Sequence, residues 1–165
     1  MKLTPKGKEA ALGSPEEKAD LYDKLLKGKE EDGGNIADYV YKGICYEAVA
    51  YVRYLKGGSI SFEDIVTLSG DKWVPKLKFE DGQVWNGTMH LETGKAIGFK
   101  RVSPIQEFFH AGITSGGTYI RAINGKLLGE KWTKSINIVD VLGTRNPDGT
   151  FNFDRSKIKV YISPV

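Results

Sequence analysis

Residues 108–123 read FFHAGITSGGTYIRAI and carry the clearest strand pattern in the chain. The runs FFHAGIT and TYIRAI are rich in aromatic and β-branched residues, and the glycines at 116–117 between them are a hairpin signal. Further strands are expected within residues 96–102, 135–142 and 158–162. Because these runs follow helical patterns, the sequence predicts an α+β fold with a helix packed on an antiparallel sheet.

Helix signals fill the first half of the chain. The motif Ser-Pro-Glu-Glu at residues 14–17 offers an N-cap, a first-turn proline and a capping box, and it predicts a helix that ends at Gly28. A second apolar stripe with helical spacing begins at Cys45 and ends at the glycines 57–58. Residues 61–64, SFED, are the capping signal of a short third helix.

The chain of 165 residues is expected to form one globular unit. We divide it into an N-terminal extension with one helix, residues 1–34, and a main domain, residues 35–165. The first 13 residues are polar, so they are expected to be frayed.

Composition excludes several classes of function. The net charge of +3 comes from 24 basic and 21 acidic residues that are interspersed, so no nucleic-acid partner is expected. No apolar run approaches the ~20 residues that span a bilayer, so no membrane span is expected. One cysteine and two histidines exclude cysteine-based zinc or iron–sulfur sites, and we expect neither metal nor cofactor. The N-terminus has lysines but no apolar core of a signal peptide, which leaves cytoplasmic residence, leaderless export or a removed leader.

Cys45 and His110 are the candidate catalytic residues. A helix start favours an anion and lowers a thiol pKa, so Cys45 is a candidate nucleophile, although its place on an apolar stripe also fits a structural cysteine. His110 shares its strand face with Gly112, which leaves room above the ring. His90 follows a turn signal and is the second-ranked base. The sequence therefore predicts a Cys45–His110 pair within hydrogen-bond reach.

Several short motifs resemble the NlpC-type cell-wall peptidases of the papain-like thiol hydrolase superfamily. They are LETGKAIGF at residues 91–99, HAGI at 110–113 and, after the glycine turn, IRA at 120–122, with Cys45 upstream at a helix start. The resemblance spans roughly residues 41–124. It implies a papain-like (NlpC-type) fold and a peptide or peptidoglycan-like substrate. The chain departs from the usual D-C-[SG] motif, because Ile44 precedes Cys45 and the bulky Tyr46 follows it.

The residue that orients the histidine is the weakest part of the resemblance. The family places His, Asn or Asp where this chain has Arg121, which only donates hydrogen bonds. A two-residue hairpin turn puts Arg121 on the face of His110, whereas a three-residue loop puts Asn124 within its reach. We predict Asn124 as the orienting residue, with Arg121, a carboxylate from elsewhere or no orienting residue as alternatives. Tyr41, Tyr46 and Arg121 are predicted to bind substrate.

The resulting hypothesis is a monomeric, cysteine-dependent amide hydrolase. His110 takes the thiol proton, and Cys45 attacks an amide carbonyl to give a thioester. The alternatives are a catalytically inactive binding module on the same fold, favoured by Tyr46 and Arg121, and a deamidase or acyltransferase that acts on a protein. An exported toxin or effector of this kind can have a cognate inhibitor or immunity protein, and the sequence identifies none.

Overall fold

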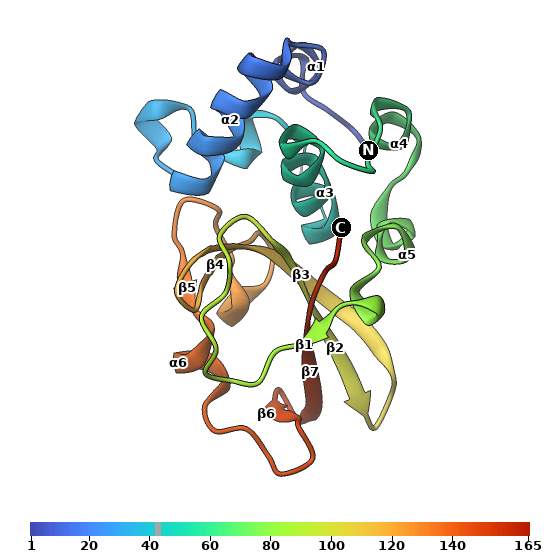
Figure 1. Ribbon diagram of the computed structural model, residues 1–165, viewed down its shortest axis with the longest axis vertical. Helices are drawn as coiled ribbons and strands as arrows, with labels where there is room; N and C mark the ends of the chain where they lie inside the picture. Colours follow the sequence, from blue (N-terminus) through green and yellow to red (C-terminus); the bar gives the residue numbers. More distant parts are fainter. Residues whose placement is uncertain (42–43) are drawn as a thin grey trace.

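The computed structural model describes residues 1–41 and 44–165. Helices occupy the first half of the chain, and strands occupy the second half (Figure 1). The helices of the first half are α1 (Pro5–Ala11), α2 (Pro15–Lys27), α3 (Cys45–Lys56), α4 (Phe62–Thr67) and α5 (Trp73–Leu77). Short 3₁₀ turns connect them at Glu30–Asp32, Ile36–Asp38, Gly70–Lys72 and Phe79–Asp81.

All paired strands of the sheet run antiparallel in the order β1-β7-β2-β3-β4-β5, and β6 pairs with β7. The strands are β1 (Gln83–Val84), β2 (Ala96–Ser103), β3 (Glu107–Gly116), β4 (Tyr119–Arg121), β5 (Ile136–Asn137), β6 (Phe151–Phe153) and β7 (Ser156–Ile162). A 3₁₀ turn at Lys126–Leu128 and helix α6 (Ile138–Leu142) lie within the connections of the sheet. The predicted α+β fold is therefore confirmed.

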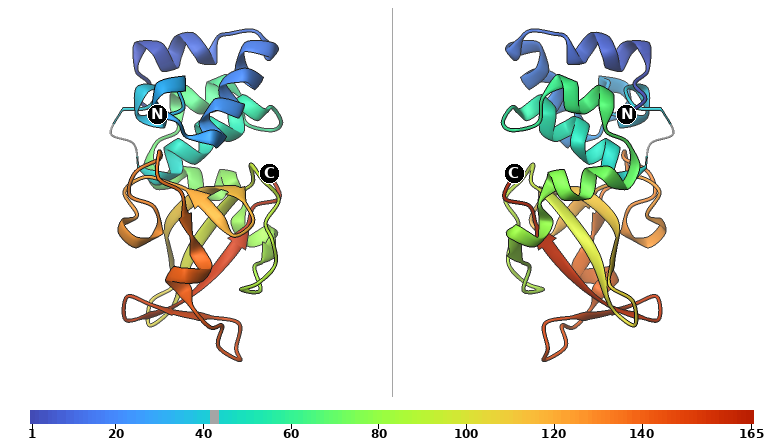
Figure 2. Two further views of the ribbon diagram at one scale, coloured as in Figure 1. Left: turned by 90° about the vertical axis from the view of Figure 1, so that its left-hand side faces the viewer. Right: turned by 90° about the vertical axis from the view of Figure 1, so that its right-hand side faces the viewer.

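Two hydrophobic clusters lie on opposite faces of the central strands. The first cluster joins α3 to the sheet through Ala96, Ala111 and Ile113. The second cluster holds the alternate residues of the same sheet, including Ile97 and Phe99. Because side chains alternate along a strand, residues in the first cluster face α3 and their neighbours face away from it. Figure 2 shows the helical layer at one end of the molecule and the curled sheet at the other.

The N-terminal extension is ordered and packed, so the expectation that it is frayed was wrong. Thr4 caps α1, and the segment holds two helices rather than one. The phenol of Tyr51 in α3 donates to the carbonyl of Gly7 at 2.7 Å, and Tyr54 donates to Ala11 at 2.6 Å. These buried hydrogen bonds tie α1 to the helix that carries Cys45. The polar composition concealed them because few of the residues in α1 are buried.

The capping signals predicted the other helices well. Ser14 and Glu17 form the expected capping box, and Gly28 ends α2 in the left-handed region with φ 64°. One strand prediction failed, because residues 135–142 form only the two-residue strand β5 before the chain turns into α6. Asn137 caps this short helix, which local strand propensity did not indicate.

The β3–β4 hairpin has a register that neither expected turn predicts. Gly116 pairs with Tyr119 and Ile113 pairs with Arg121, so the tight turn lies at Gly117 and the following threonine. An irregularity between Thr114 and Gly116 shifts the ladder by one residue. As a result, β4 ends at Arg121, and the part of β3 that carries His110 and Ala111 continues beyond the end of β4.

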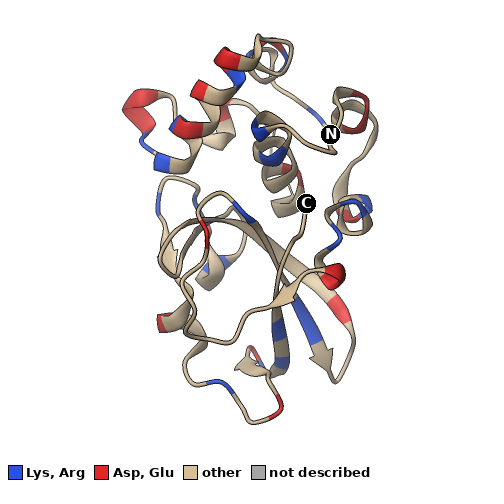
Figure 3. Ribbon diagram, viewed as in Figure 1, with Lys and Arg blue, Asp and Glu red and all other residues tan. Residues whose placement is uncertain are grey.

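The surface carries both signs of charge. Figure 3 shows acidic and basic residues interspersed over the helices and basic residues along β2 and β7. The basic residues on these strands include Lys100, Lys157 and Lys159. Lys100 pairs with Glu80, and Lys157 pairs with Asp148 at 3.6 Å. Within the described ranges, no helix has the length and apolar character needed to cross a membrane.

Candidate functional site

Cys45 is the first residue of α3, as predicted, and its side chain lies against the edge of β3. Ile44 is the N-cap residue of the helix and makes no side-chain capping bond. Cys45 is 7% exposed, and its thiol lies close to the backbone of Ala111, which lowers the pKa of the thiol. Backbone polar groups of a strand point along the sheet toward neighbouring strands. Since β4 stops opposite Ile113, the thiol occupies the edge of β3 just beyond the end of β4.

Burial governs the acidity of this thiol. It raises the pKa of Cys45 above its ordinary value, while hydrogen bonds with the backbone of Ala111, Tyr46 and Cys45 itself oppose the rise. The helix start lowers the pKa as expected, but burial outweighs this contribution and the pKa of the thiol is raised. The effect of the helix terminus is smaller than the cost of placing a thiolate in a buried position. At neutral pH the resting group is the neutral thiol.

His110 lies on β3 with its ring on the face opposite α3. Phe99 pairs with His110 and Lys100 pairs with Phe108, so Phe109 is an extra residue that forms a bulge. The bulge places Phe109 and His110 on the same side of the sheet. The imidazole stacks on Phe99 with the ring centroids 5.5 Å apart, and its Nε2 lies 2.8 Å from the carbonyl oxygen of Leu128.

This hydrogen bond fixes the tautomer of the imidazole. A carbonyl oxygen only accepts, so Nε2 carries the proton and Nδ1 is the unprotonated nitrogen. Burial lowers the pKa of His110 to about 4, and the hydrogen bond to Leu128 opposes this change. His110 is therefore a neutral imidazole at neutral pH, with Nδ1 available to accept a proton.

Cys45, at the start of α3, approaches β3 next to the position of His110, but the structure does not join the two side chains directly. The thiol meets the backbone of Ala111, the residue that follows His110. Among the described residues no hydrogen bond links the thiol to the imidazole, so the predicted contact is not formed in this conformation. Sequence reasoning did not predict the bulge at Phe109, which brings Phe109 onto the same face as His110.

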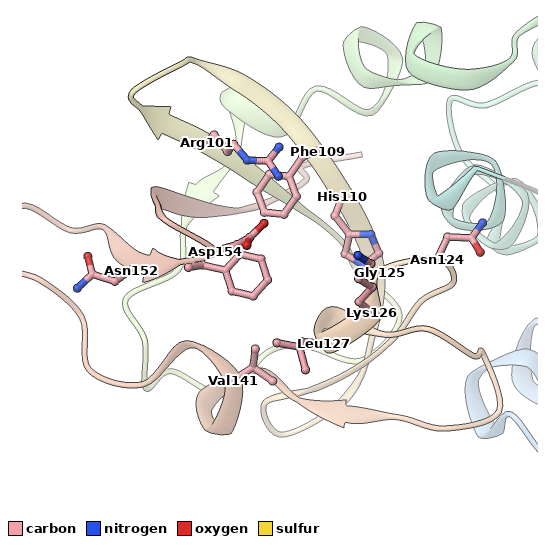
Figure 4. Close-up of a pocket in the computed structure, with 11 residues that line it drawn as sticks. Arg101, Phe109, His110, Asn124, Gly125, Lys126, Leu127, Val141, Asn152 and Asp154 are labelled. Carbon is pink, nitrogen blue, oxygen red and sulfur yellow. The ribbon is translucent and has the colours of Figure 1, made fainter.

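The carbonyl of Leu128, rather than Asn124, orients the histidine. Figure 4 shows the amide of Asn124 turned away from the imidazole, at the side of the ring that faces the helices. Asn124 itself has φ 58°, a left-handed conformation that asparagine tolerates well. The sequence gives no signal for Leu128, because a backbone carbonyl can orient a histidine whatever the side chain.

Arg121 has a structural role in this structure, and its part in substrate binding stays a prediction. Its Nε donates to the carbonyl of Leu26 at 2.7 Å, and its two terminal nitrogens donate to Lys27 at 2.7 Å and Trp132 at 3.0 Å. The guanidinium thus caps the C-terminal end of α2, where carbonyl groups lack helical partners. A Cβ atom at Gly28 would lie 2.4 Å from this guanidinium, so only glycine fits there.

Replacement of Arg121 by methionine should lower the free energy of unfolding by about 3 kcal/mol. The substitution keeps the apolar stem but removes hydrogen bonds to three carbonyls, and each bond to a charged donor is worth roughly 1.5–3 kcal/mol without being additive. Urea unfolding followed by circular dichroism measures the change. Arg145→Met is the matched control, because Arg145 is exposed and a change of less than about 0.5 kcal/mol is expected there. Equal stabilities of the two variants would contradict this role.

The two tyrosines proposed to bind substrate differ in exposure. Tyr41 is 47% exposed, and the ammonium of Lys2 lies 5.6 Å from its ring centroid. Tyr46 is buried, and its hydroxyl makes no hydrogen bond within the part of the chain that the structure describes. Burial raises the pKa of this phenol. Tyr46 therefore belongs to the core under α3, whereas Tyr41 is accessible to a ligand.

A cavity of about 510 Å³ lies beside His110 on the side away from α3 (Figure 4). Its wall includes Phe109, the stacked ring of Phe153 from β6, and the loop that follows β4. The sequence reading missed this cavity, because its residues come from strands and loops that no single motif joins. His90 lines a separate cavity of about 440 Å³ near the start of β1, which leaves it apart from the thiol.

Neither a metal-binding cluster nor a matching family model identifies the chemistry of this site. Across residues 1–41 and 44–165 no group of three or more His, Cys, Asp or Glu side chains is arranged to hold a metal ion. A scan of the sequence against protein-family models finds no matching family, and a search of the curated proteins finds no match.

Proposed function

We propose that the protein is a cysteine-dependent amide hydrolase with papain-like organisation, with Cys45 as nucleophile and His110 as base. The observation that carries this proposal is the proximity of the Cys45 thiol to the backbone of Ala111, the residue immediately after His110 in β3. This position puts the thiol at the strand edge, which side chains from either face of the strand can approach. The hydrogen bond to Leu128 supports the same assignment, because it leaves Nδ1 as the proton acceptor.

The mechanism follows from two groups that are both neutral at rest. As Sγ attacks the carbonyl carbon of an amide, Nδ1 of His110 accepts the thiol proton, and a tetrahedral intermediate forms. His110 then gives this proton to the leaving nitrogen, the C–N bond breaks, and a thioester and a free amine result. In the second half, water gives a proton to His110 and attacks the thioester, the C–S bond breaks, and Cys45 recovers its proton. The imidazole must reach the thiol for these transfers, and hydrogen bonds of this kind commonly tighten when substrate binds.

The substrate class comes from the sequence resemblance to cell-wall peptidases. We propose a peptide or peptidoglycan stem peptide as the acyl donor. A deamidase or an acyltransferase would use the same thioester and would differ in the leaving group or in the acceptor of the second half. The exposed Tyr41 lies four residues before Cys45 and is available to contact a bound peptide.

One observation favours the second candidate, an inactive binding module. Burial raises the pKa of the thiol, whereas many thiol enzymes lower it. A structural cysteine would show the same environment. The two functions differ in one property, which is whether His110 accelerates the reaction of Cys45 with a carbonyl compound.

Acetylation by 4-nitrophenyl acetate tests this difference without knowledge of the natural substrate. Cys45 is the one thiol of the chain, so its thioester can be identified by mass spectrometry and its formation followed through release of nitrophenol. At pH 7 we expect His110→Gln to slow acetylation about 100-fold, the size of a general-base contribution. Cys45→Ala supplies the background from amines. His90→Gln is the matched control and should react like the native protein. Equal, slow acetylation in the native protein and His110→Gln would overturn the hydrolase and favour the binding module.

A further inference from the structure

The cavity beside His110 has an apolar wall formed by two stacked rings. The centroids of Phe109 and Phe153 are 5.9 Å apart with an angle of 16° between the planes. Leu127 and Val141 continue this wall, and Leu127 is 68% exposed at the mouth. A volume of about 510 Å³ lies in the range of small-ligand sites, so one amino-acid residue fits with space for water. An apolar group of a ligand in this cavity would bury the apolar wall, which is now exposed to solvent, and this burial favours binding.

Charged groups of both signs surround this apolar wall. The guanidinium of Arg101 lies 4.1 Å from the ring centroid of Phe109, and one of its nitrogens is 3.3 Å from Glu107. Among the described residues Arg101 makes no other ion pair, so further N–H donors of its guanidinium are available to a ligand. Lys126 makes no ion pair with any described residue. In Figure 4 the carboxylate of Asp154 points into the cavity toward Arg101.

The polar lining is suited to a ligand that has both charges. Two cations, Arg101 and Lys126, offer donors to a carboxylate, and Asp154 offers an acceptor to an ammonium or amide N–H. The remaining polar side chain beside the cavity is His110, because the amides of Asn124 and Asn152 point away from it in Figure 4, and Asn152 accepts a hydrogen bond from Asn146 at 3.1 Å. A ligand with only a negative charge would be repelled by Asp154. A ligand with only a positive charge would be repelled by Arg101 and Lys126.

We propose that this cavity binds the amine component released from the substrate, as an amino acid with an apolar side chain and a free α-carboxylate. The inference rests on the proposed function, because His110 gives its proton to the leaving nitrogen and the leaving group must then lie beside the imidazole. The side chain packs on Phe109 and Phe153, the carboxylate meets Arg101 and Lys126, and the released ammonium meets Asp154. The substrate would thus be a peptide that is cut before an apolar C-terminal residue.

Binding of phenylalanine to the native protein tests the proposal directly. The chain has two histidines, so the ring signals of His110 and His90 can be assigned by NMR and compared within one titration. Phenylalanine should shift the His110 signal and leave the His90 signal unchanged. Phenylalaninamide, which lacks the carboxylate, should bind about tenfold more weakly. Lys126→Gln should weaken phenylalanine binding to a similar degree, and Lys134→Gln, at an exposed position without an ion pair in the described chain, should not.

The outcomes separate this proposal from the proposed function. The absence of a shift at His110, or equal affinity for phenylalanine and its amide, would overturn the assignment of the cavity even if Cys45 is acetylated with the help of His110. If phenylalanine binds as expected and Cys45 is inert, the cavity is the ligand site of a binding module and the hydrolase is overturned. Cys45→Ala should retain phenylalanine binding, because the thiol is not among the residues that line the cavity.

Discussion

Replacement of Cys45 by alanine is expected to abolish amide hydrolysis and to leave the fold in place. The thiol is the only sulfur nucleophile of the chain, and removal of a nucleophile costs at least about 10³-fold in turnover in enzymes of this type. The stability cost should be about 1 kcal/mol, because a single buried sulfur is lost from the first turn of α3. Release of free amines from a peptidoglycan digest, followed by mass spectrometry, measures the activity.

Two further observations make this experiment decisive. Cys45→Ser keeps a polar group of similar size at the helix start, yet a hydroxyl is a much weaker nucleophile beside a neutral imidazole, so this variant should also be inactive. Circular dichroism and urea unfolding show whether each variant is folded. Full activity in folded Cys45→Ala would exclude the thioester mechanism, and activity that is lost only together with the fold would leave Cys45 with a structural role.

The helices could be predicted because their signals are local. Ser14 and Ser61 each accept a hydrogen bond from a backbone N–H three residues later, and this interaction depends on residues that are neighbours in the sequence. The order of helices and strands followed from the same kind of signal. Helix α1 also has a local start signal, Thr4 as N-cap followed by Pro5, but its polar composition concealed it, and tertiary contacts such as the hydrogen bond from Tyr51 to Gly7 across 44 residues hold it in place.

The site was harder to predict because it depends on small shifts in the strands. A single bulge at Phe109 decides which side chains of β3 share a face, and a one-residue change of hairpin register ends β4 opposite Ile113. The choice between Asn124 and Arg121 was posed as a question of register, and the observed register matches neither expectation. Backbone carbonyls, rather than side chains, bind both His110 and Arg121. The carbonyl of Leu128 orients His110, and a carbonyl at the end of α2 accepts a hydrogen bond from Arg121. The alternation of apolar and polar residues along the sequence does not predict these contacts, because they involve backbone carbonyls.

The buried imidazole of His110 should make the stability of the protein depend on pH. Its pKa is lowered from an ordinary value of 6.5 to about 4, so the unfolded chain binds a proton more readily than the folded protein between these values. Stability from this group is therefore complete above pH 6.5 and is lost as the pH falls through 4. At about 1.36 kcal/mol for each pKa unit, the loss from pH 7 to below pH 4 is about 3 kcal/mol.

Urea unfolding of the native protein and of His110→Gln across pH 4 to 7 isolates this contribution. Glutamine keeps a donor for the carbonyl of Leu128 but does not titrate. Between pH 7 and pH 4 the free energy of unfolding should therefore fall by about 3 kcal/mol less in the variant than in the native protein. His90→Gln, a change at an exposed histidine, should follow the native curve. Parallel curves for the native protein and His110→Gln would mean that His110 titrates normally and is reached by solvent. Since a solvated imidazole would be partly protonated near neutral pH, that result would also remove the argument that Nδ1 is held ready as the proton acceptor for Cys45.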